Sequence, residues 1–568
     1  MQPITIEPVW NVQYDKGMPT SIELEHANAL DMFLSSVRRS PDSALLHYLD
    51  STLTVSEVDR LSDALAVGLA ANGIARGDRV AMYLQNMPQY VIAMIATWKL
   101  GAIVAAVNPM YREKEVLHVL TDSGAKGIVC LESLYRDVVQ KVRDASSLSV
   151  VITTSELDFV ASPQNFSVLD GITRERAPRT LDFVDVTVEY VGQKPPPIEG
   201  VGPSDVACLT YTSGTTGTAK GAMNTHGNIV FNAQSYRDWI NLSSEDTIFG
   251  VAPLFHITGL VGHMALAMLT PMPLVLMYRF NAAMVLEQVE RWKATFTIGS
   301  ITVFTALMNE PTADNFDISS LKKIYTGGQG VAPSTVVAFQ AKFGAYIHIA
   351  YGLTETTSPS HFVPLNGRSP VDKSSGALSV GVPIFDTLST IVDEEGREVP
   401  PGTVGEIIIK GPQVVPGYWQ NPEETANAFK DSWLFTGDVG LMDEEGWFYV
   451  VDRKKDLINA SGYKIWPKEV EDALMQHPSV LEAAVIGVPD EYRGETVKGF
   501  VSLKVGMHVE PDELKKYCRE IIASYKCPSE IEILDDLPKN VAGKILRREL
   551  RDRETGVRTV TANSGFKS

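Results

Sequence analysis

Three segments of the sequence place glycine-containing loops directly after short apolar runs, and two of these loops also carry hydroxyl and charged residues. The richest follows Ala207–Tyr211 and reads TSGTTGTAKG, from Thr212 to Gly221. Glycines let backbone N–H groups approach a phosphate, hydroxyls add donors, and Lys220 adds a positive charge. It is not a Walker A loop, because two residues separate Gly217 from Lys220. The composition predicts a phosphate-binding loop, with an ordinary surface turn as the alternative. Its candidate residues are Thr212, Ser213, Gly214, Thr215, Thr216, Gly217 and Lys220.

The other two segments have the chemistry to hold a flat ring and a metal ion. Residues 327–330 read GGQG and offer bare backbone to a ring, although a plain turn explains this segment equally well. The third segment, YGLTETTS, contains a stacking face in Tyr351, a hydroxyl in Thr354 and a carboxylate in Glu355. Such a carboxylate can hold a Mg²⁺ that bridges phosphate oxygens. A solvated glutamate is the alternative for Glu355.

The elements before these loops alternate between helix-like and strand-like patterns. Thr54 and Glu57 form a capping-box pattern that begins a helix, and Gly73 ends it. Further helices are expected up to about residue 100 and over 113–122, and strands over 80–84, 103–107, 127–130 and 150–153. This alternation predicts parallel sheets covered by helices, whose strands carry ligand-binding loops at their carboxyl ends.

The pattern changes after about Phe385. Short alternating runs at 388–393 and 404–410, separated by turn clusters, predict antiparallel strands and a small barrel. The charged cluster 452–456 precedes a final unit of helices and strands. We therefore expect two domains, residues 1–452 and 453–568. In the second we expect helices over 469–476 and 512–523 and strands over 480–488 and 497–505.

Length and charge exclude several classes of protein. The 568 residues exceed what one core supports, and 44% hydrophobic with 21% charged residues exclude a disordered chain. The net charge of −19 argues against a nucleic-acid partner. Residues 453–568 carry 20 Lys or Arg against 19 Asp or Glu, so the acidity lies before them.

Cysteine usage and hydropathy indicate a cytoplasmic protein. The cysteines stand singly, which indicates a reducing compartment and no zinc site. They are Cys130, Cys208, Cys518 and Cys527. The N-terminus does not resemble a secretory signal. The longest apolar stretch, 259–277, contains His263, Pro271 and Pro273, which favours a buried helix followed by a strand over a membrane span. A homodimer is an open alternative to a monomer.

Six motifs in a fixed order resemble the adenylate-forming superfamily. They are TSGTTGTAKG, YGLTE, TGD, DRKKD, SGYKIWPKEVE and KNVAGKILRREL, and they span Thr212 to Leu550. The superfamily includes acyl-CoA and aryl-CoA ligases, luciferases and peptide-synthetase adenylation domains, and the likeness is to its bacterial medium- and long-chain fatty acyl-CoA ligases. The resemblance implies an α/β fold. A large N-terminal domain of two βαβ subdomains and a small β-barrel would precede a mobile α+β C-terminal domain.

The resemblance also implies roles around ATP. The loop from Thr212 to Lys220 would clasp the phosphates, and Glu355 would bind Mg²⁺. Gly328 and Tyr351 would border the adenine, and Thr354 would contact the α-phosphate.

Four further residues take roles from the same resemblance. Asp438 would accept both ribose hydroxyls with Arg453 beside it, and Lys455 would be the hinge between domains. Lys544 would be the adenylation lysine, so that Lys544, Glu355, Thr354 and Lys220 are the candidate catalytic residues. A cation placed where charge gathers in the transition state is worth on the order of 10²–10³-fold in rate.

Ser461 and Gly462 would lie on the loop beside the pantetheine chain of CoA. Some ligases of the superfamily carry lysines at the positions of Asn459 and Ser461, and here both residues are small and uncharged. The contacts of the C-terminal domain with AMP and CoA therefore cannot be copied from those relatives.

The acyl pocket is expected between residues 253–256, a strand over 301–304, Gly328 and residues 356–358. His256 would line or gate it, or alternatively would be a core histidine bonded to backbone. These segments contain no basic residue that would suggest a second carboxylate on the substrate. Their composition therefore favours a largely apolar monocarboxylic acid. The candidate pocket residues are Phe255, His256, Gly259, Phe304, Gly327, Gly328 and Thr356.

The sequence thus predicts an ATP-dependent acid–CoA ligase that uses ATP, Mg²⁺ and CoA, with a fatty acid favoured. Open alternatives are a ligase for aryl or alicyclic acids and a ligase that loads the phosphopantetheine of a carrier protein. A nucleotide sensor without activity is disfavoured by Lys544 and Glu355, and a transporter by the interrupted apolar stretches.

Overall fold

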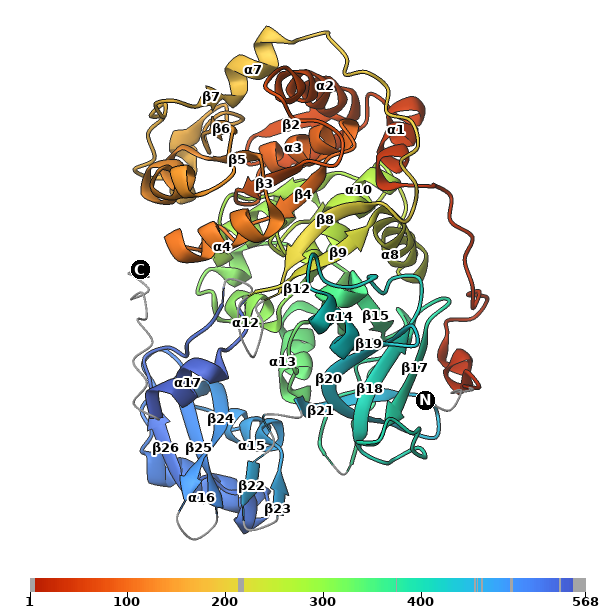
Figure 1. Cartoon of the computed structure of the whole chain (residues 1–568). Coiled ribbons are helices and arrows are strands. Elements are labelled where there is room, and N and C mark those ends of the chain that lie inside the picture. The colour runs from red at the N-terminus through yellow and green to blue at the C-terminus, as the bar shows by residue number, and fades with distance from the viewer. Residues whose placement is uncertain are drawn as a thin grey trace.

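The computed structural model describes residues 6–212, 219–373, 375–453, 456, 458–460, 463–490, 494–540 and 543–554. These residues form a large N-terminal lobe and a smaller C-terminal lobe, drawn in blue in Figure 1. Several candidate residues lie outside the described ones, namely Ser213, Gly214, Thr215, Thr216, Gly217, Lys455, Ser461 and Gly462.

One sheet of the large lobe has seven strands in the order β7-β6-β5-β3-β4-β8-β9, parallel except for β9. Its strands are β3 (Arg79–Tyr83), β4 (Ile103–Ala106), β5 (Gly127–Leu131), β6 (Val150–Thr154), β7 (Leu181–Asp182), β8 (Val206–Tyr211) and β9 (Gly221–Thr225). The helices connected with it are α2 (Val55–Ala71), α3 (Pro88–Lys99), α4 (Glu113–Ser123), α7 (Phe183–Glu189) and α8 (His226–Trp239). The strands and helices predicted up to residue 154 are all present.

The second sheet has nine strands in the order β16-β15-β14-β13-β12-β10-β11-β1-β2, with parallel pairing from β14 to β1. Its strands are β1 (Ala44–Tyr48), β2 (Ser51–Thr54), β10 (Ile248–Phe249), β11 (Leu274–Leu276), β12 (Phe296–Gly299), β13 (Lys323–Thr326), β14 (Ile347–Leu353), β15 (Ser358–Phe362) and β16 (Val382–Pro383). Its helices are α1 (Ala29–Arg39), α9 (Ile257–Gly259), α10 (Leu266–Leu269), α11 (Ala282–Trp292), α12 (Ile301–Asn309) and α13 (Pro333–Phe343).

The antiparallel element expected after Phe385 is a five-stranded sheet. It contains β17 (Leu388–Val392), β18 (Gly405–Lys410), β19 (Phe429–Lys430), β20 (Trp433–Met442) and β21 (Phe448–Arg453), with α14 (Pro422–Ala428) beside it. The C-terminal lobe contains β22 (Ile458–Ala460), β23 (Tyr463–Ile465), β24 (Val480–Asp490), β25 (Gly494–Leu503), β26 (Glu530–Ile533), α15 (Pro467–Met475), α16 (Pro511–Ile521) and α17 (Arg547–Glu554). One cluster of buried hydrophobic side chains spans both large sheets. The buried side chains of β24 and β25 belong to two other clusters in the C-terminal lobe.

Local sequence explains the start of α2. The Thr54 Oγ1 accepts from the Glu57 N–H at 3.2 Å, and a Glu57 carboxylate oxygen accepts from the Thr54 N–H at 2.8 Å. These two bonds satisfy donors that a helix end leaves open. The predicted capping box is confirmed.

The strand predicted over 301–304 is wrong. Residues 301–304 form the first turn of α12, and the strand before it is β12, which ends at Gly299. Ile301, Thr302 and Val303 are β-branched and favour a strand by composition, but in α12 the buried Phe304 ring lies 5.6 Å from the ring of Phe339 on α13. Tertiary packing overrode the local preference.

The apolar stretch 259–277 is buried and runs through α10 into β11, as predicted. Among the described residues, no helix is long and apolar enough to cross a membrane.

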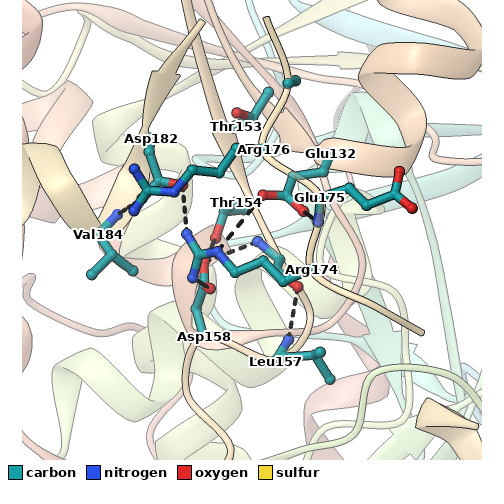
Figure 2. Close-up of polar contacts among 12 residues, drawn as sticks. Glu132, Thr153, Thr154, Leu157, Asp158, Arg174, Glu175, Arg176, Asp182 and Val184 are labelled. Carbon is teal, nitrogen blue, oxygen red and sulfur yellow. Dashed lines mark hydrogen bonds and ion pairs between the residues drawn. The ribbon is translucent and has the colours of Figure 1, made fainter.

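Three carboxylates at the carboxyl ends of β5, β6 and β7 share one arginine (Figure 2). Arg174 pairs with Asp158 and with Asp182, and its Nε lies 3.8 Å from the Glu132 Oε1. The carboxylate side chains are at most 8% exposed. We call these four residues the Arg174 cluster. This ion cluster fills an edge of the sheet at which such folds often bind ligands.

Candidate active site

The base of the predicted phosphate loop is a β-hairpin. Tyr211 and Gly221 are partners in the antiparallel pairing of β8 with β9, and the Thr212 N–H donates to the Lys220 carbonyl at 3.0 Å. A ring nitrogen of His118 on α4 lies 2.7 Å from the Ala219 carbonyl oxygen. These contacts hold Lys220 at the end of the hairpin.

Lys220 and Glu355 belong to one chain of polar contacts. The Lys220 ammonium pairs with Glu424 on α14 and lies 5.3 Å from the centre of the Tyr418 ring. The Tyr418 hydroxyl donates to the Glu355 Oε1 at 2.6 Å. Burial, with the Glu355 charge adding to it, raises the pKa of Tyr418 far above its ordinary value. Tyr418 therefore stays protonated and donates to the carboxylate.

Asp438 and Tyr351 meet on the other side of the site. Asp438 on β20 is 7% exposed, and the Tyr351 hydroxyl on β14 donates to its Oδ2 at 2.8 Å. Arg453 is the partner of Asp438 in the antiparallel pairing of β20 with β21. The structure thus brings these three predicted residues together from three strands.

The turn after Glu355 has an unusual backbone. Thr357 and Ser358 have positive φ angles of 52° and 88°, which costs on the order of 1–3 kcal/mol for such residues. The Asn232 side-chain amide donates to the Thr356 and Thr357 carbonyls at 2.9 and 2.6 Å, and the Tyr236 hydroxyl lies 2.8 Å from the Ser358 Oγ. Contacts from α8 therefore hold the turn in one conformation.

Two glycines after β13 are required for different reasons. A Cβ on Gly327 would lie 2.7 Å from the Ala350 carbonyl oxygen, so no side chain fits between the strands. Gly328 has a φ of 84° with open space around it, so only its backbone conformation demands glycine. Bare backbone therefore faces the cavity at this point.

Lys544 of the C-terminal lobe reaches the same site. Its N–H donates to the Asn540 Oδ1 at 2.8 Å, and the preceding Gly543 has a φ of 75°. A Cβ on Gly543 would overlap the Thr302 Oγ1, so this turn packs closely on the first turn of α12. Burial, with the Lys544 charge adding to it, lowers the pKa of His256 to about 4. His256 is therefore neutral near pH 7, and Lys544 is the cation beside it.

A cavity of about 4290 Å³ lies between the lobes and is lined by both. Most of the predicted residues that the structure describes line it. They are Thr212, Lys220, Phe255, His256, Gly327, Gly328, Tyr351, Thr354, Glu355, Asp438 and Lys544.

Three predicted pocket residues do not line this cavity. Gly259 lies against the Pro253 carbonyl with no room for a Cβ, and it allows α9 to start close to that loop. Phe304 is fully buried, with its ring centre 5.6 Å from that of Phe339. The Thr356 Oγ1 is fully buried and accepts from the Leu353 N–H at 2.8 Å. These residues support the wall from behind.

His256 has both of the properties that the sequence left as alternatives. Its Nδ1 accepts from the Thr258 N–H at 3.3 Å, as a core histidine would, and the residue also lines the cavity.

Sequence reasoning missed several residues of the site, among them Tyr236, Asn232, Tyr418 and Glu424. Asn232 and Tyr236 stand four residues apart on α8, so they share one face of that helix. A polar stripe on an otherwise buried helix is the signal that could have found them. No comparable signal distinguishes Tyr418 or Glu424, because each lies in an ordinary turn or helix start.

Comparisons with known proteins agree with this geometry. The model of the AMP-binding enzyme family matches residues 33–419, and that of the AMP-binding enzyme C-terminal domain matches residues 469–544. A long-chain-fatty-acid–CoA ligase of Bacillus subtilis (strain 168) is 36% identical over 560 residues, 96% of this chain and 98% of that protein. A feruloyl-CoA synthase of Amycolatopsis sp is 35% identical over 517 residues, 91% of this chain and 97% of that protein. The crystal structure of an anthranilate CoA ligase in complex with anthranoyl-AMP has a TM-score of 0.84 at 25% identity, and the match covers 94% of this chain and 98% of that one.

Proposed function

Because this chain belongs to the AMP-binding enzyme family, we propose that it activates a largely apolar carboxylic acid with ATP and transfers the acyl group to CoA. The observation that carries this proposal is the position of Lys544. A lysine of the C-terminal lobe lines the same cavity as Lys220, Glu355 and Asp438 of the N-terminal lobe. Such an arrangement suits a reaction between a carboxylate and a nucleoside triphosphate.

In the first half-reaction the acid carboxylate attacks the α-phosphate of ATP, and pyrophosphate leaves. Lys544 stabilises the negative charge that gathers on the phosphate oxygens in the transition state. Thr354 contacts the α-phosphate, and Lys220 with the loop from Thr212 holds the leaving pyrophosphate. Both cations act where two anions would otherwise repel each other.

The nucleoside is held on the opposite side of the cavity. Asp438 accepts the two ribose hydroxyls, since one carboxylate can accept two O–H donors, and Arg453 stands beside it. Tyr351 borders the adenine together with the bare backbone at Gly328. The bond from Tyr351 to Asp438 supports this assignment because it keeps the carboxylate oriented toward the cavity.

Glu355 fits the chemistry of a Mg²⁺ ligand, because it is a carboxylate on the cavity wall and Mg²⁺ uses one or two protein carboxylates together with substrate phosphates. When bound, the ion would neutralise phosphate charge. The Tyr418 hydroxyl orients the Glu355 carboxylate for this role.

The second half-reaction is thioester formation from the acyl-adenylate and CoA. We propose that the C-terminal lobe rotates about Lys455, which withdraws Lys544 and presents the loop with Ser461 and Gly462 to the pantetheine chain. The two half-reactions need different groups in one site, and a rotating lobe supplies them in turn. The chain passes from the sheet of β21 to that of β22 between residues 453 and 458, which supports the domain boundary after Asp452.

A fatty acid is the favoured substrate. The residues that line the cavity include His256 and the apolar side chains of Phe249, Phe255, Ile298 and Met308. The similarity to a long-chain-fatty-acid–CoA ligase supports a fatty acid, and the similarity to a feruloyl-CoA synthase keeps an aryl acid as the second candidate. The cytoplasmic location and the homodimer stay predictions from the sequence.

The experiment that tests this function is acid-dependent exchange of labelled pyrophosphate into ATP, run over fatty acids of two to eighteen carbons and a set of aryl and alicyclic acids. We expect exchange with apolar monocarboxylic acids and none with dicarboxylic acids. Free CoA and a phosphopantetheine carrier protein are then compared as acceptors. Absence of exchange with every acid would contradict the proposal. Transfer of the acyl group to the carrier protein alone would show that the carrier protein, and not CoA, is the acceptor.

The hydrogen bond from Tyr418 to Glu355 gives a separate prediction. Tyr418→Phe removes the hydroxyl and leaves the ring beneath Lys220, so we expect kcat/KM for MgATP to fall by about tenfold, as befits one hydrogen bond to a charged group. Tyr449→Phe is the matched control, because its hydroxyl on β21 donates to the Asp443 Oδ2 in the connection between β20 and β21 at 2.8 Å. Equal effects of the two substitutions would contradict a role of Tyr418 in the site.

A further inference from the structure

The C-terminal lobe contains a buried ion network that begins in the segment joining the two lobes. Asp456 is the one described residue between β21 and β22, and it is 7% exposed. The Arg551 Nη2 donates to its Oδ1 at 2.7 Å, and the Arg547 Nη1 lies 3.5 Å from its Oδ2. Both arginines belong to α17, at the far end of the lobe's sequence.

The network continues into the core of the lobe. Arg547 donates from its Nη2 and Nε to the Glu471 Oε1 at 2.7 and 3.0 Å. The same oxygen accepts from the Val485 N–H at 2.9 Å. Two guanidinium groups therefore meet two buried carboxylates, which is the balance that such a site needs. The result is a connection between Asp456, α15, β24 and α17.

The Lys544 turn is fixed directly to α17. Asn540 and Lys544 exchange two bonds of 2.8 Å, one from the Asn540 N–H to the Lys544 carbonyl and one from the Lys544 N–H to the Asn540 Oδ1. The Leu546 N–H donates to the Pro538 carbonyl at 2.8 Å, and α17 begins at the next residue. Lys544 thus moves with α17.

Two routes lead from the joining segment into the lobe, and they serve different faces. The chain leads from Asp456 to β22, which pairs with β23, so these strands are attached to the joining segment covalently. Lys544 comes 88 positions later, and the short route from the joining segment to it passes through Arg547 and Arg551.

We propose that Asp456 is a positioning residue for adenylation: by holding α17 through Arg547 and Arg551, it makes the Lys544 turn follow the rotation of the joining segment. This inference rests on the proposed function, because it uses the adenylation role of Lys544. It adds a division of labour. The position of β22 is set by its covalent link to the joining segment, whereas the position of the Lys544 turn is set by the bonds of Asp456 to α17.

The test uses Asp456→Asn in the full chain. An asparagine presents one acceptor oxygen and turns its NH₂ group toward an arginine donor, so one of the two arginine contacts is lost. We expect acid-dependent ATP–pyrophosphate exchange to fall by about tenfold, because a charge-assisted hydrogen bond is worth about that much. Thioester formation from preformed acyl-adenylate and CoA should change by less than about twofold.

Three further variants sharpen the result. Arg553→Gln removes an exposed ion pair of α17 with Glu532 and should leave both half-reactions at the wild-type rate. Arg551→Gln should also lower ATP–pyrophosphate exchange, and combining it with Asp456→Asn should lower it by less than the product of the two single effects, because the two residues share a bond. Asp456→Glu restores the charge and should recover part of the exchange.

A second readout does not depend on catalysis. In Asp456→Asn, backbone hydrogen exchange of residues 538–550 should rise, whereas that of β24 should stay protected. An equal loss of both half-reactions in Asp456→Asn, or an unchanged rate of ATP–pyrophosphate exchange, would overturn the inference while leaving the proposed function standing. Absence of ATP–pyrophosphate exchange in the wild-type enzyme would instead overturn the proposed function.

Discussion

Replacing Lys544 with alanine is expected to lower acid-dependent ATP–pyrophosphate exchange by about 10²–10³-fold, the effect of removing one positioned charge from a transition state. Lys544 reaches the cavity from a tightly closed turn and lies close enough to His256 to lower the pKa of that residue. Since His256 is neutral near pH 7, it cannot replace the lost charge.

The substitution should separate the two half-reactions. Hydrolysis of preformed acyl-adenylate, and its conversion to thioester by CoA, should be largely intact because Lys544 acts before the adenylate exists. Lys539→Ala is the matched control, since Lys539 belongs to the same segment but pairs with Glu482 at 2.6 Å and Asp536 at 2.7 Å. Normal exchange in Lys544→Ala would contradict the assignment.

The second large effect is expected on stability. Replacing Arg174 with methionine should destabilise the large lobe by about 3–5 kcal/mol, the usual cost of leaving buried charges without their partner. Glu132, Asp158 and Asp182 lie almost fully buried around the guanidinium (Figure 2). Methionine keeps much of the length of the side chain and removes the charge and the donors.

Hydrogen exchange across β5, β6 and β7, together with thermal unfolding, measures this loss in a chain with two lobes. Lys141→Met is the control, because Lys141 is 56% exposed and pairs with Glu113, which is 52% exposed. A similar change in both variants would show that the Arg174 cluster is no more important than a surface ion pair.

The loss caused by Arg174→Met should depend on pH. Burial raises the pKa of Glu132 and of Asp158 even with Arg174 present. Removal of the Arg174 charge should raise both pKa values further. A raised pKa in the folded state means that folding takes up protons, so stability falls as the pH rises through the titration range. As the pH falls from 8, the variant should therefore gain more stability than the wild type, and the difference in stability between the two should become smaller. A gap that widens on acidification would contradict this account.

The local elements were predictable because their causes lie within a few residues. The capping box of α2, the strands β3 to β6 and the helices of the C-terminal lobe depend on neighbouring side chains and on hydrophobic period. The prediction failed at 301–304, where a β-branched run forms the start of α12. The packing of Phe304 against Phe339 decided that element, and no local pattern reports such a contact.

The candidate site was predictable in its chemistry and less so in its walls. Hydroxyls, glycines and charges after apolar strands indicated nucleotide binding, and the motif order indicated which residues take part. Gly259, Phe304 and Thr356 lie behind the wall, because a residue's depth depends on what packs against it from other elements. Tyr418 and Glu424 escaped notice for the same reason.

By itself the sequence determined the types of chemistry available, their order along the chain and the secondary structure around them. These properties follow from residue identity and from interactions over a few positions. Only the tertiary structure decided that Glu355 is bonded to Tyr418, that Lys220 is paired with Glu424 across 204 positions, and that Lys544 enters a cavity built by the other lobe. Contacts of that separation depend on how two sheets and a C-terminal lobe pack together, and local patterns carry no record of that packing.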